Sequence, residues 1–372
     1  MKRTEQPHAT WLEINLAAVE RNVRYILENT GVPFMAVLKA NAYGHGAVEV
    51  GKAALKAGAA WLSVARVNEG MALREAGISA PVLVLGMPTF GEVDMAIANT
   101  LTLPLPGFEA AEHFAQRAAA LGRSLQVHIK VDTGMGRLGV LPDQVLALAQ
   151  KALSLGGMEL DGIFSHFAMA DRDRDPLMGV QLKNFETALE ALEGAGLRPR
   201  WAHLSNTGAS LTLPAARFDM VRGGESALGL NPFSFRALTE PLEPALTAWK
   251  ARLVSCKRLP PGWGVGYGSD YVTSGEEIVG VVSAGFGDGI RRLPGNEVLI
   301  DGTRVPVIGA TCMDAVMVSL PKCYPINTEV VLLGTSGEET IGIMDIARRF
   351  KTVHVDFLMG ITSRVPRVYY WN

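Results

Sequence analysis

A lysine at the end of an apolar run is the first feature of this sequence that could do covalent chemistry. Lys39 is the second-last residue of the stretch "FMAVLKA", and "NAYGHG", which is rich in loop-forming residues, follows directly. A buried lysine is costly unless it is paired, neutral or covalently used. Desolvation lowers the pKa of an amine and so favours a nucleophile or a Schiff base. A strand-end lysine that extends its charge into solvent is the alternative interpretation.

A second group of polar residues lies in and after "VHIKVDTGMGR". Because side chains alternate along a strand, His128, Lys130 and Asp132 are expected on one face, which in a barrel is the interior. Arg137 follows in a glycine-rich loop, where a guanidinium can clamp a carboxylate or a phenolate. A structural ion pair between Lys130 and Asp132, with Arg137 in solvent, is the alternative.

Further polar residues gather where the last three apolar runs of the first two thirds end. They are His166, His203, Asn206, Thr207, Arg222 and Gly224. Glycine amides and a threonine hydroxyl are groups that can hold a phosphate. A lone histidine on a strand is more often a core residue, but several strand-end polar residues that converge favour a site.

Eight short apolar runs must position these residues. They span residues 34–40, 61–65, 81–86, 101–106, 125–132, 162–167, 201–206 and 218–224. Between them lie stretches with helical periodicity, such as "AVEVGKAALKAG" and "LMGVQLKNFETALEALEGAG", the second ending in glycines with Pro199 beyond. The alternation predicts a (β/α)₈ barrel with its site at the carboxyl ends of the strands. In a doubly wound sheet, the alternative, the polar residues would instead cluster at one switch point.

The sequence pattern changes after "LTEPLEPALT", residues 238–247, and the segments that follow are strand-like. We therefore expect a barrel domain at 1–240 and a mostly-β domain at 241–372, with a hairpin turn at Asp301–Gly302 and one short helix in "MDIARRF". The glycine-rich "GWGVGYGSDY" lacks the strand and helix that flank a dinucleotide site. It is read as a flexible loop or as one that presents Tyr267.

Composition excludes several classes of protein. The 372 residues are 48% apolar and 19% charged with a formal net charge of -2, and no basic stripe suggests nucleic acid. No apolar run approaches the ~20 residues that span a bilayer, and the N-terminus has no signal-peptide core. The three cysteines lack metal-ligand spacing. We expect a cytoplasmic protein with no metal site.

Taken together, the motifs resemble those of the pyridoxal-phosphate-dependent alanine racemases. They occur in family order as "AVLKANAYGHG", "KVDTGMGRLG", "SHFA", "HLSN", "VRGG", "GYGSDY", "AGFGDG", "CMDAVMV" and "RVPRVY". The resemblance implies a (β/α)₈ barrel followed by a β domain. It also implies a head-to-tail homodimer with shared active sites that interconverts L- and D-alanine and supplies D-alanine for peptidoglycan.

The resemblance further implies roles for single residues toward the cofactor. Lys39 would hold pyridoxal phosphate as an internal aldimine, and Arg222 would face the pyridine nitrogen. An always-charged donor keeps that nitrogen unprotonated and weakens the ring as an electron sink, which suits racemisation over transamination or decarboxylation. The other implied cofactor contacts are Tyr43, His166, Asn206, Thr207 and Gly224, with His203 behind Arg222.

The remaining implied roles concern the substrate. Lys39 and the partner's Tyr267 would act as bases on opposite faces of a planar carbanion, Lys39 for D-alanine and Tyr267, as a phenolate, for L-alanine. Arg137 would bind the substrate carboxylate, oriented by a carbamylated Lys130. Met313 would line the pocket through its backbone, with Asp314 and Ser363 in support.

Departures from the family pattern keep rival functions open. Ser363 stands where a tyrosine that crowds the substrate is usual, which predicts a roomier pocket and a racemase that accepts serine or larger side chains. Glu225, Leu228 and the pair Phe286–Gly287 also depart from it. An amino-acid decarboxylase would pair an acid, rather than Arg222, with the pyridine nitrogen. A non-catalytic pyridoxal-phosphate-binding protein would resemble the barrel alone.

Overall fold

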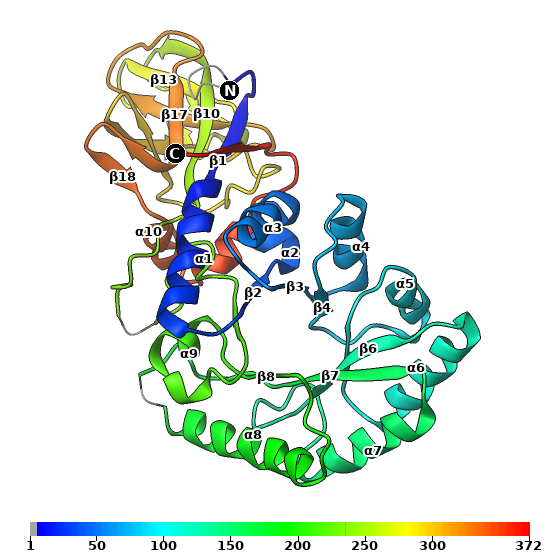
Figure 1. The fold of residues 1–372 in the computed structure, drawn as a ribbon. Coiled ribbons are helices and arrows are strands. Elements are labelled where there is room, and N and C mark those ends of the chain that lie inside the picture. The colour runs from blue at the N-terminus through cyan, green and yellow to red at the C-terminus, as the bar shows by residue number, and fades with distance from the viewer. Residues whose placement is uncertain (1–5, 174, 235) are drawn as a thin grey trace. The chain divides into compact units, whose positions relative to one another are not determined.

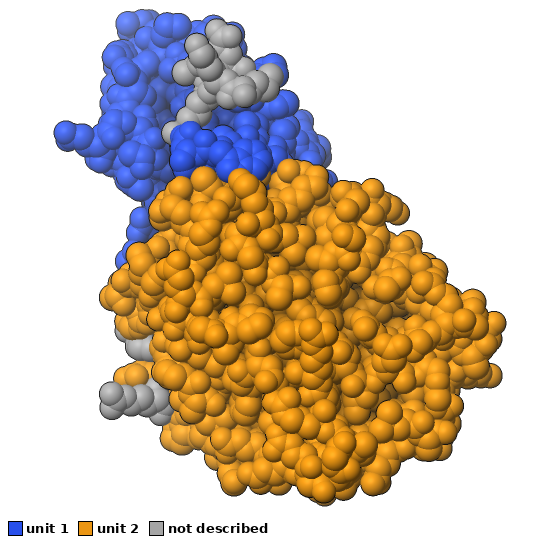
Figure 2. All heavy atoms as spheres, viewed as in Figure 1, with its two compact units in different colours: residues 1–15, 43–45, 245–372 blue, residues 16–42, 46–244 orange. Residues whose placement is uncertain are grey.

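The computed structural model describes residues 6–173, 175–234 and 236–372, and the chain divides into two compact units (Figures 1 and 2). Unit 1 comprises residues 1–15, 43–45 and 245–372, and unit 2 comprises residues 16–42 and 46–244. The segment that follows Lys39 therefore passes from unit 2 into unit 1 and back within a few residues.

Unit 2 is a barrel of parallel strands surrounded by helices (Figure 1). Its strands, eight within the described residues, are β2 (Phe34–Val37), β3 (Trp61–Val64), β4 (Val82–Val84), β5 (Leu103–Leu105), β6 (Leu125–Lys130), β7 (Met158–Phe164), β8 (Trp201–His203) and β9 (Val221–Gly223). They pair as β4-β3-β2-β9 and as β5-β6-β7-β8. Backbone hydrogen bonds join the two groups, from Val84 N to Thr102 O (2.9 Å) and from Arg222 N to Ser205 O (3.1 Å). The predicted (β/α)₈ barrel is confirmed, because each of the eight apolar runs contributes one strand.

The helices of unit 2 follow the strands in alternation. They are α1 (Leu16–Thr30), α3 (Ala47–Lys56), α4 (Val67–Glu75), α5 (Val93–Ala98), α6 (Phe108–Leu121), α7 (Val145–Leu155), α8 (Pro176–Gly194) and α9 (Thr207–Thr212). In α8, the Asp175 side chain accepts from Leu177 N, and Pro176 occupies the first turn, where no backbone donor is needed. The helix ends before Gly196, whose φ is 70°, as its glycines predict.

The barrel interior combines an apolar cluster with polar side chains. Met35, Trp61, Leu83 and Met220 are buried together, and Trp201 packs against them. Burying each such large side chain contributes ~1.5–3 kcal/mol. The Trp61 ring lies 5.2 Å from the ring of the buried His128, so the apolar cluster borders the polar part of the interior.

Unit 1 is built on a sheet that closes on itself. Its strands are β1 (Thr10–Asn15), β10 (Leu246–Leu259), β13 (Glu277–Val282), β14 (Glu297–Ile300), β15 (Thr303–Ile308), β16 (Val316–Leu320), β17 (Glu329–Ser336), β18 (Glu339–Ile341) and β19 (Arg367–Tyr370). They follow the order β18-β17-β14-β15-β16-β13-β10-β1-β19, and β17 also pairs with β10. A separate short hairpin joins β11 (Gly264–Val265) to β12 (Tyr271–Val272).

The hairpin turn and the short helix that were predicted in unit 1 are also confirmed. Asp301 and Gly302 connect β14 to β15 with φ values of 50° and 74°, the left-handed conformation that two-residue hairpin turns require. The expected short helix is α10 (Ile343–Arg349), and a second helix, α11 (His354–Gly360), follows it. Throughout the part of the chain that the structure describes, no helix has the length and apolar character needed to cross a membrane.

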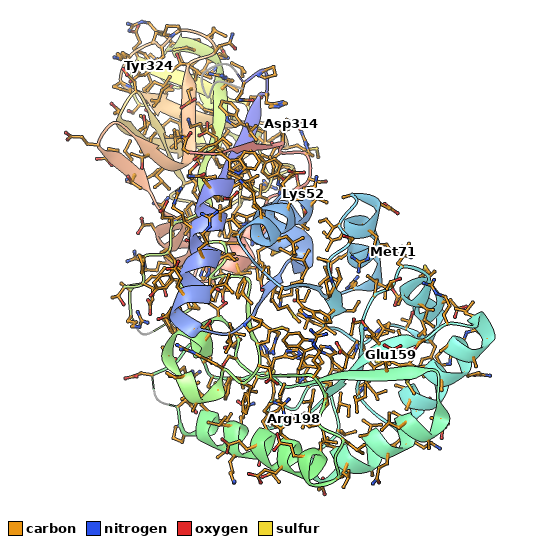
Figure 3. The ribbon with its side chains drawn as sticks, in the orientation of Figure 1. Lys52, Met71, Glu159, Arg198, Asp314 and Tyr324 are labelled. Atoms are coloured by element: carbon orange, nitrogen blue, oxygen red, sulfur yellow. The ribbon has the colours of Figure 1, made fainter. Side chains whose placement is uncertain are left out.

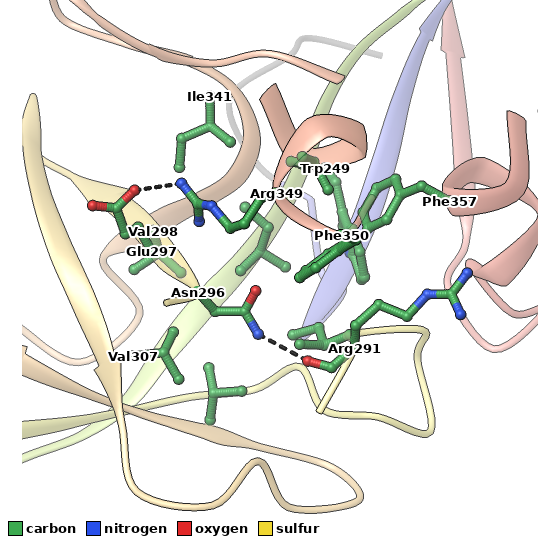
Figure 4. Close-up of a pocket in the computed structure, with 14 residues that line it drawn as sticks. Trp249, Arg291, Asn296, Glu297, Val298, Val307, Ile341, Arg349, Phe350 and Phe357 are labelled. Atoms are coloured by element: carbon green, nitrogen blue, oxygen red, sulfur yellow. Dashed lines mark hydrogen bonds and ion pairs between the residues drawn. The ribbon is translucent and has the colours of Figure 1, made fainter. Parts of the chain in front are cut away.

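A small pocket in unit 1 lies among apolar side chains (Figure 4). Trp249, Phe350 and Phe357 line it, and an ion pair between Arg349 Nη2 and Glu297 Oε2 (2.6 Å) lies beside it. Its volume of about 40 Å³ has room for roughly three water molecules.

Candidate functional site

At the carboxyl ends of the barrel strands, positively charged side chains lie close enough together to shift one another's pKa values. Burial and the positive charges of Arg222, Lys130, Arg137 and Lys39, in that order, hold the pKa of His166 well below its usual value. The barrel thus brings together residues that lie as far apart in the sequence as Lys39 and Arg222. Such a concentration of positive charge suits an anionic ligand.

Arg222, on β9, is the most buried of these cations, with 3% of its surface exposed. Its Nη1 donates to His203 Nδ1 (2.8 Å) and His203 O (3.0 Å), and its Nη2 donates to Ser165 O (2.7 Å) and Leu204 O (3.1 Å). These acceptors are all neutral. Burial lowers the pKa of Arg222 to about 9, so the guanidinium stays charged at neutral pH.

Lys130 ends β6 with 6% of its surface exposed. Its Nζ donates to Val131 O (3.1 Å) and lies 5.1 Å from the centroid of the Phe164 ring. Burial, followed by the charges of Arg222 and Arg137, lowers the pKa of Lys130 to about 7. A large fraction of this amine is therefore neutral and nucleophilic at physiological pH.

Asp132 organises the glycine-rich loop that follows β6. Its Oδ1 accepts from the N–H groups of Gly134, Met135 and Gly136 at 3.0–3.1 Å, and its Oδ2 accepts from Arg137 N (3.1 Å). Although partial burial opposes it, these bonds lower the pKa of Asp132. β6 ends at Lys130, and Asp132 follows it at the point where Val131 N still donates to Phe164 O (2.9 Å). The loop leaves the Arg137 side chain exposed.

Lys39 follows β2 and is half-buried. Burial and the charge of Arg137 lower its pKa, while Glu225 and Glu69 oppose that shift. The residues after it form a left-handed turn within α2 (Lys39–Tyr43), with φ between 51° and 56° at positions 40–43. This conformation costs ~1–2 kcal/mol per non-glycine residue, and such strain is concentrated at functional sites.

Glu69, on α4, is a site residue that sequence reasoning missed. Its Oε1 accepts from Ala40 N (2.6 Å), and its Oε2 accepts from Ala65 N (2.8 Å) and Arg66 N (3.0 Å). One carboxylate thus fixes the backbone directly after Lys39 to the end of β3. The capping pattern of a glutamate three residues into α4 is visible in the sequence, but its bond to Ala40 joins two distant segments.

The residues expected to bind a phosphate lie at the start of α9 and after β9. Asn206 accepts from Ala209 N (3.3 Å) and donates to Phe167 O (3.4 Å), so its side chain caps α9. Thr207 is 5% exposed, and Gly224 is buried. Tyr43 belongs to unit 1, where Arg367 Nε donates to the adjacent Gly44 O (2.9 Å).

Tyr267 lies in unit 1, in a short turn (Tyr267–Ser269) between β11 and β12, and 73% of its surface is exposed. Gly266 and Gly268 flank it with φ values of 76° and 73°. A Cβ on Gly266 would lie 2.6 Å from the Met317 methyl group, so both conformation and space require glycine there. The turn presents the phenol away from the core of its own unit.

The "AGFGDG" loop holds the backbone of Met313 in unit 1. Phe286 N donates to Cys312 O (3.0 Å), and Gly287 N donates to Met313 O (2.8 Å). Asp314 (labelled in Figure 3) accepts from Arg364 Nη2 at 2.7 Å, and Ser363 beside that arginine is exposed. Within the described residues, no hydrogen bond uses the Met313 N–H.

Comparison with known proteins gives consistent results over both parts of the chain. Residues 14–232 match the family model described as alanine racemase, N-terminal domain, and residues 246–369 match the C-terminal domain model. The chain is 41% identical over 365 residues to an alanine racemase of Symbiobacterium thermophilum, with 97% of each chain covered.

Solved structures of racemases are also similar to this chain over nearly its whole length. An alanine racemase from E. faecalis superposes with a TM-score of 0.92 at 36% identity, covering 98% of each chain. A histidine racemase from Leuconostoc mesenteroides superposes with a TM-score of 0.91 at 28% identity, covering 98% of this chain and 99% of that one.

Proposed function

Because the chain belongs to the alanine racemase family, we propose that it interconverts L- and D-alanine with Lys39 and Tyr267 as opposed acid–base groups. The observation that carries this proposal is the cluster of Lys39, Lys130, Arg137 and Arg222 in the barrel, whose charges act jointly on His166. The expected boundaries of 1–240 and 241–372 differ from the observed units, because β1 pairs with β10 and β19 and so belongs to unit 1. We assign unit 2 to cofactor binding and unit 1 to the domain that contributes Tyr267.

The residues of the cluster fit pyridoxal phosphate, the cofactor that the family implies. Its phosphate and phenolate are anionic, whereas Arg222 donates only to neutral carbonyl and imidazole acceptors. When bound, the cofactor withdraws electrons from the Cα of an attached amino acid and so acidifies its hydrogen. We assign Tyr43, Asn206, Thr207 and Gly224 to the phosphate end, with His166 beside the ring.

Racemisation requires that a proton leave one face of Cα and return to the other. Lys39 Nζ serves one face, since its lowered pKa raises the share of neutral amine that can take the proton. Tyr267 Oη serves the opposite face. Because Tyr267 is 73% exposed and belongs to the other unit, we propose that a second copy of the chain supplies it, in a homodimer with shared sites.

The substrate carboxylate is assigned to Arg137 and, from the second copy that supplies Tyr267, to the backbone of Met313. Asp132 fixes the Arg137 backbone, and the exposed guanidinium can form a bidentate pair with a carboxylate. The Met313 N–H is a second donor, held in place by Gly287. A Lys130 amine with a pKa of about 7 can add carbon dioxide, and the resulting carbamate would orient Arg137.

A broader amino-acid racemase is the second candidate. Two observations favour it, the small and exposed Ser363 and the likeness to a racemase named for histidine. The decarboxylase and the barrel-only binding protein receive no such support, because both racemase domains match and the residue that would face the pyridine nitrogen is the buried cation Arg222 rather than an acid. We place the reaction in the cytoplasm as a supply of D-alanine for peptidoglycan.

Incubation of L-alanine with the loaded protein in deuterated water tests the proposal. Both enantiomers labelled at Cα are expected, and Lys39→Ala should abolish both the label and the cofactor's visible absorption band. Label without inversion, or release of carbon dioxide, would contradict it. A panel that contains alanine, serine and histidine separates the two candidate racemases by their kcat/KM values.

A further inference from the structure

Behind Arg222 the barrel interior contains two histidines in series, and the second of them has a buried nitrogen without a hydrogen bond. His203 Nε2 lies 2.9 Å from His128 Nδ1, and both residues have 0% of their surface exposed. Among the described residues, His128 Nε2 has no hydrogen-bond partner. An unsatisfied buried polar group costs ~1–3 kcal/mol, so its retention calls for an explanation.

The hydrogen bond from Arg222 determines which ring nitrogen of each histidine carries the proton. A guanidinium has no acceptor, so His203 Nδ1 accepts from Arg222 Nη1 and carries no proton. A neutral His203 then bears its proton on Nε2 and donates it to His128 Nδ1. The proton of a neutral His128 is thereby forced onto Nε2. Burial lowers the pKa of both histidines, which is consistent with neutral rings.

A carboxylate lies in front of this nitrogen. Asp161 Oδ2 is 3.5 Å from His128 Nε2, and a closer approach of about 0.5 Å would form an ordinary hydrogen bond. The Asp161 side chain is 17% exposed, so the carboxylate also reaches solvent.

The strand that bears Asp161 is locally irregular in a way that serves this arrangement. Along β6 and β7, Val127 pairs with Leu160 but His128 pairs with Gly162, so Asp161 is an extra, bulged residue. Bulges re-aim side chains. At the paired position, a Cβ on Gly162 would lie 2.4 Å from His128 Nδ1, so only glycine leaves room for the imidazole.

We propose that Asp161 and His128 are positioning residues that, through His203, orient Arg222 and hold its charge toward the cofactor ring. We call the series Asp161–His128–His203–Arg222 the relay. It has an anion at one end and the buried guanidinium at the other. Each imidazole accepts a hydrogen bond on its Arg222 side and donates one on its Asp161 side. This inference rests on the proposed function, in which Arg222 faces the pyridine nitrogen. A less firmly held Arg222 would let that nitrogen take a proton, which favours transamination over racemisation.

The cofactor-free protein tests the relay itself. In protein labelled with ¹⁵N-histidine, with its seven histidines assigned by single substitutions, His128 and His203 are expected as neutral rings protonated on Nε2. Asp161→Asn should shift the ¹⁵N signals of His128 and, more weakly, of His203. Glu159→Gln, which removes the same charge from an exposed position of the same strand (Glu159 is labelled in Figure 3), should shift neither.

The loaded protein tests the consequence for Arg222. Asp161→Asn should raise the number of transamination events per racemisation by roughly three- to tenfold. This is the size expected when a charge-assisted hydrogen bond is lost and its effect reaches Arg222 through two imidazole rings. Glu159→Gln should leave that ratio unchanged. A proton on Nδ1 of either histidine, or two variants that behave alike in either experiment, would overturn the proposal. Correct tautomers in a protein that does not racemise alanine would instead count against the proposed function alone.

Discussion

Replacing Gly162 with alanine is expected to destabilise the barrel by about 1–3 kcal/mol. The new Cβ would lie 2.4 Å from His128 Nδ1, 2.5 Å from its Cγ and 2.6 Å from its Cε1. Carbon atoms in contact prefer about 3.5 Å, so the ring must move by roughly 1 Å. Overpacking of this kind costs ~1–3 kcal/mol, and loss of the bond between His128 and His203 adds about 1 kcal/mol. The lower backbone entropy of the unfolded alanine chain offsets ~0.5–1 kcal/mol.

Gly179→Ala is the matched control for this substitution. Gly179 is an exposed residue of α8, and nothing lies within 4 Å of the Cβ it would gain. The same chemical change should therefore stabilise the protein by ~0.5–1 kcal/mol. Urea unfolding followed by tryptophan fluorescence suits both variants, because the Trp61 ring lies 5.2 Å from that of His128. Equal midpoints for the two variants would refute the steric reasoning.

Three further substitutions have expected outcomes. Burial lowers the pKa of Lys130 from 10.5 to about 7, so between these pH values the unfolded chain binds more protons than the folded one. The free energy of unfolding should therefore rise with pH across this range. In buffer free of carbon dioxide, Lys130→Met should weaken the pH dependence of the urea midpoint. With ¹³C-bicarbonate, the parent protein should give a carbamate NMR signal that Lys130→Met lacks. Tyr267→Phe should slow racemisation by roughly 10²–10⁴-fold, and a smaller loss would argue against an acid–base role. Ser363→Tyr should lower the serine-to-alanine ratio of kcat/KM, and an unchanged ratio would remove Ser363 from the pocket.

The barrel strands could be predicted because their signals are local. Continuous apolar runs bounded by glycine and proline are typical of parallel strands covered on both faces, and every such run in the first two thirds is a strand. β1 was missed, since its pairing with β10 and β19 joins residues more than 230 positions apart, which no local pattern records. The first half of β7 was missed as well, because Glu159 and Asp161 interrupt its apolar pattern.

The candidate site was only partly predictable. The types and strand-end positions of Lys39, Lys130 and Arg222 were readable, whereas their burial and mutual influence depend on closure of the barrel. The left-handed turn at positions 40–43 contradicts local propensity, since only Asn41 there favours positive φ. Asp161 carried no signal, because a bulge reverses the direction that strand alternation assigns to a side chain.

Co-expression of Lys39→Ala and Tyr267→Ala chains measures most directly whether one site draws on two chains. Each homodimer of either variant should be inactive. A mixed dimer would combine the intact Lys39 of one chain with the intact Tyr267 of the other at one of its two sites. Mixed dimers isolated with two affinity tags should therefore have about half of the parental activity, and the unfractionated random mixture about a quarter. If the mixed dimers isolated with two affinity tags were as inactive as either variant alone, the proposal that an amine and a phenol from different chains act on one substrate would be contradicted.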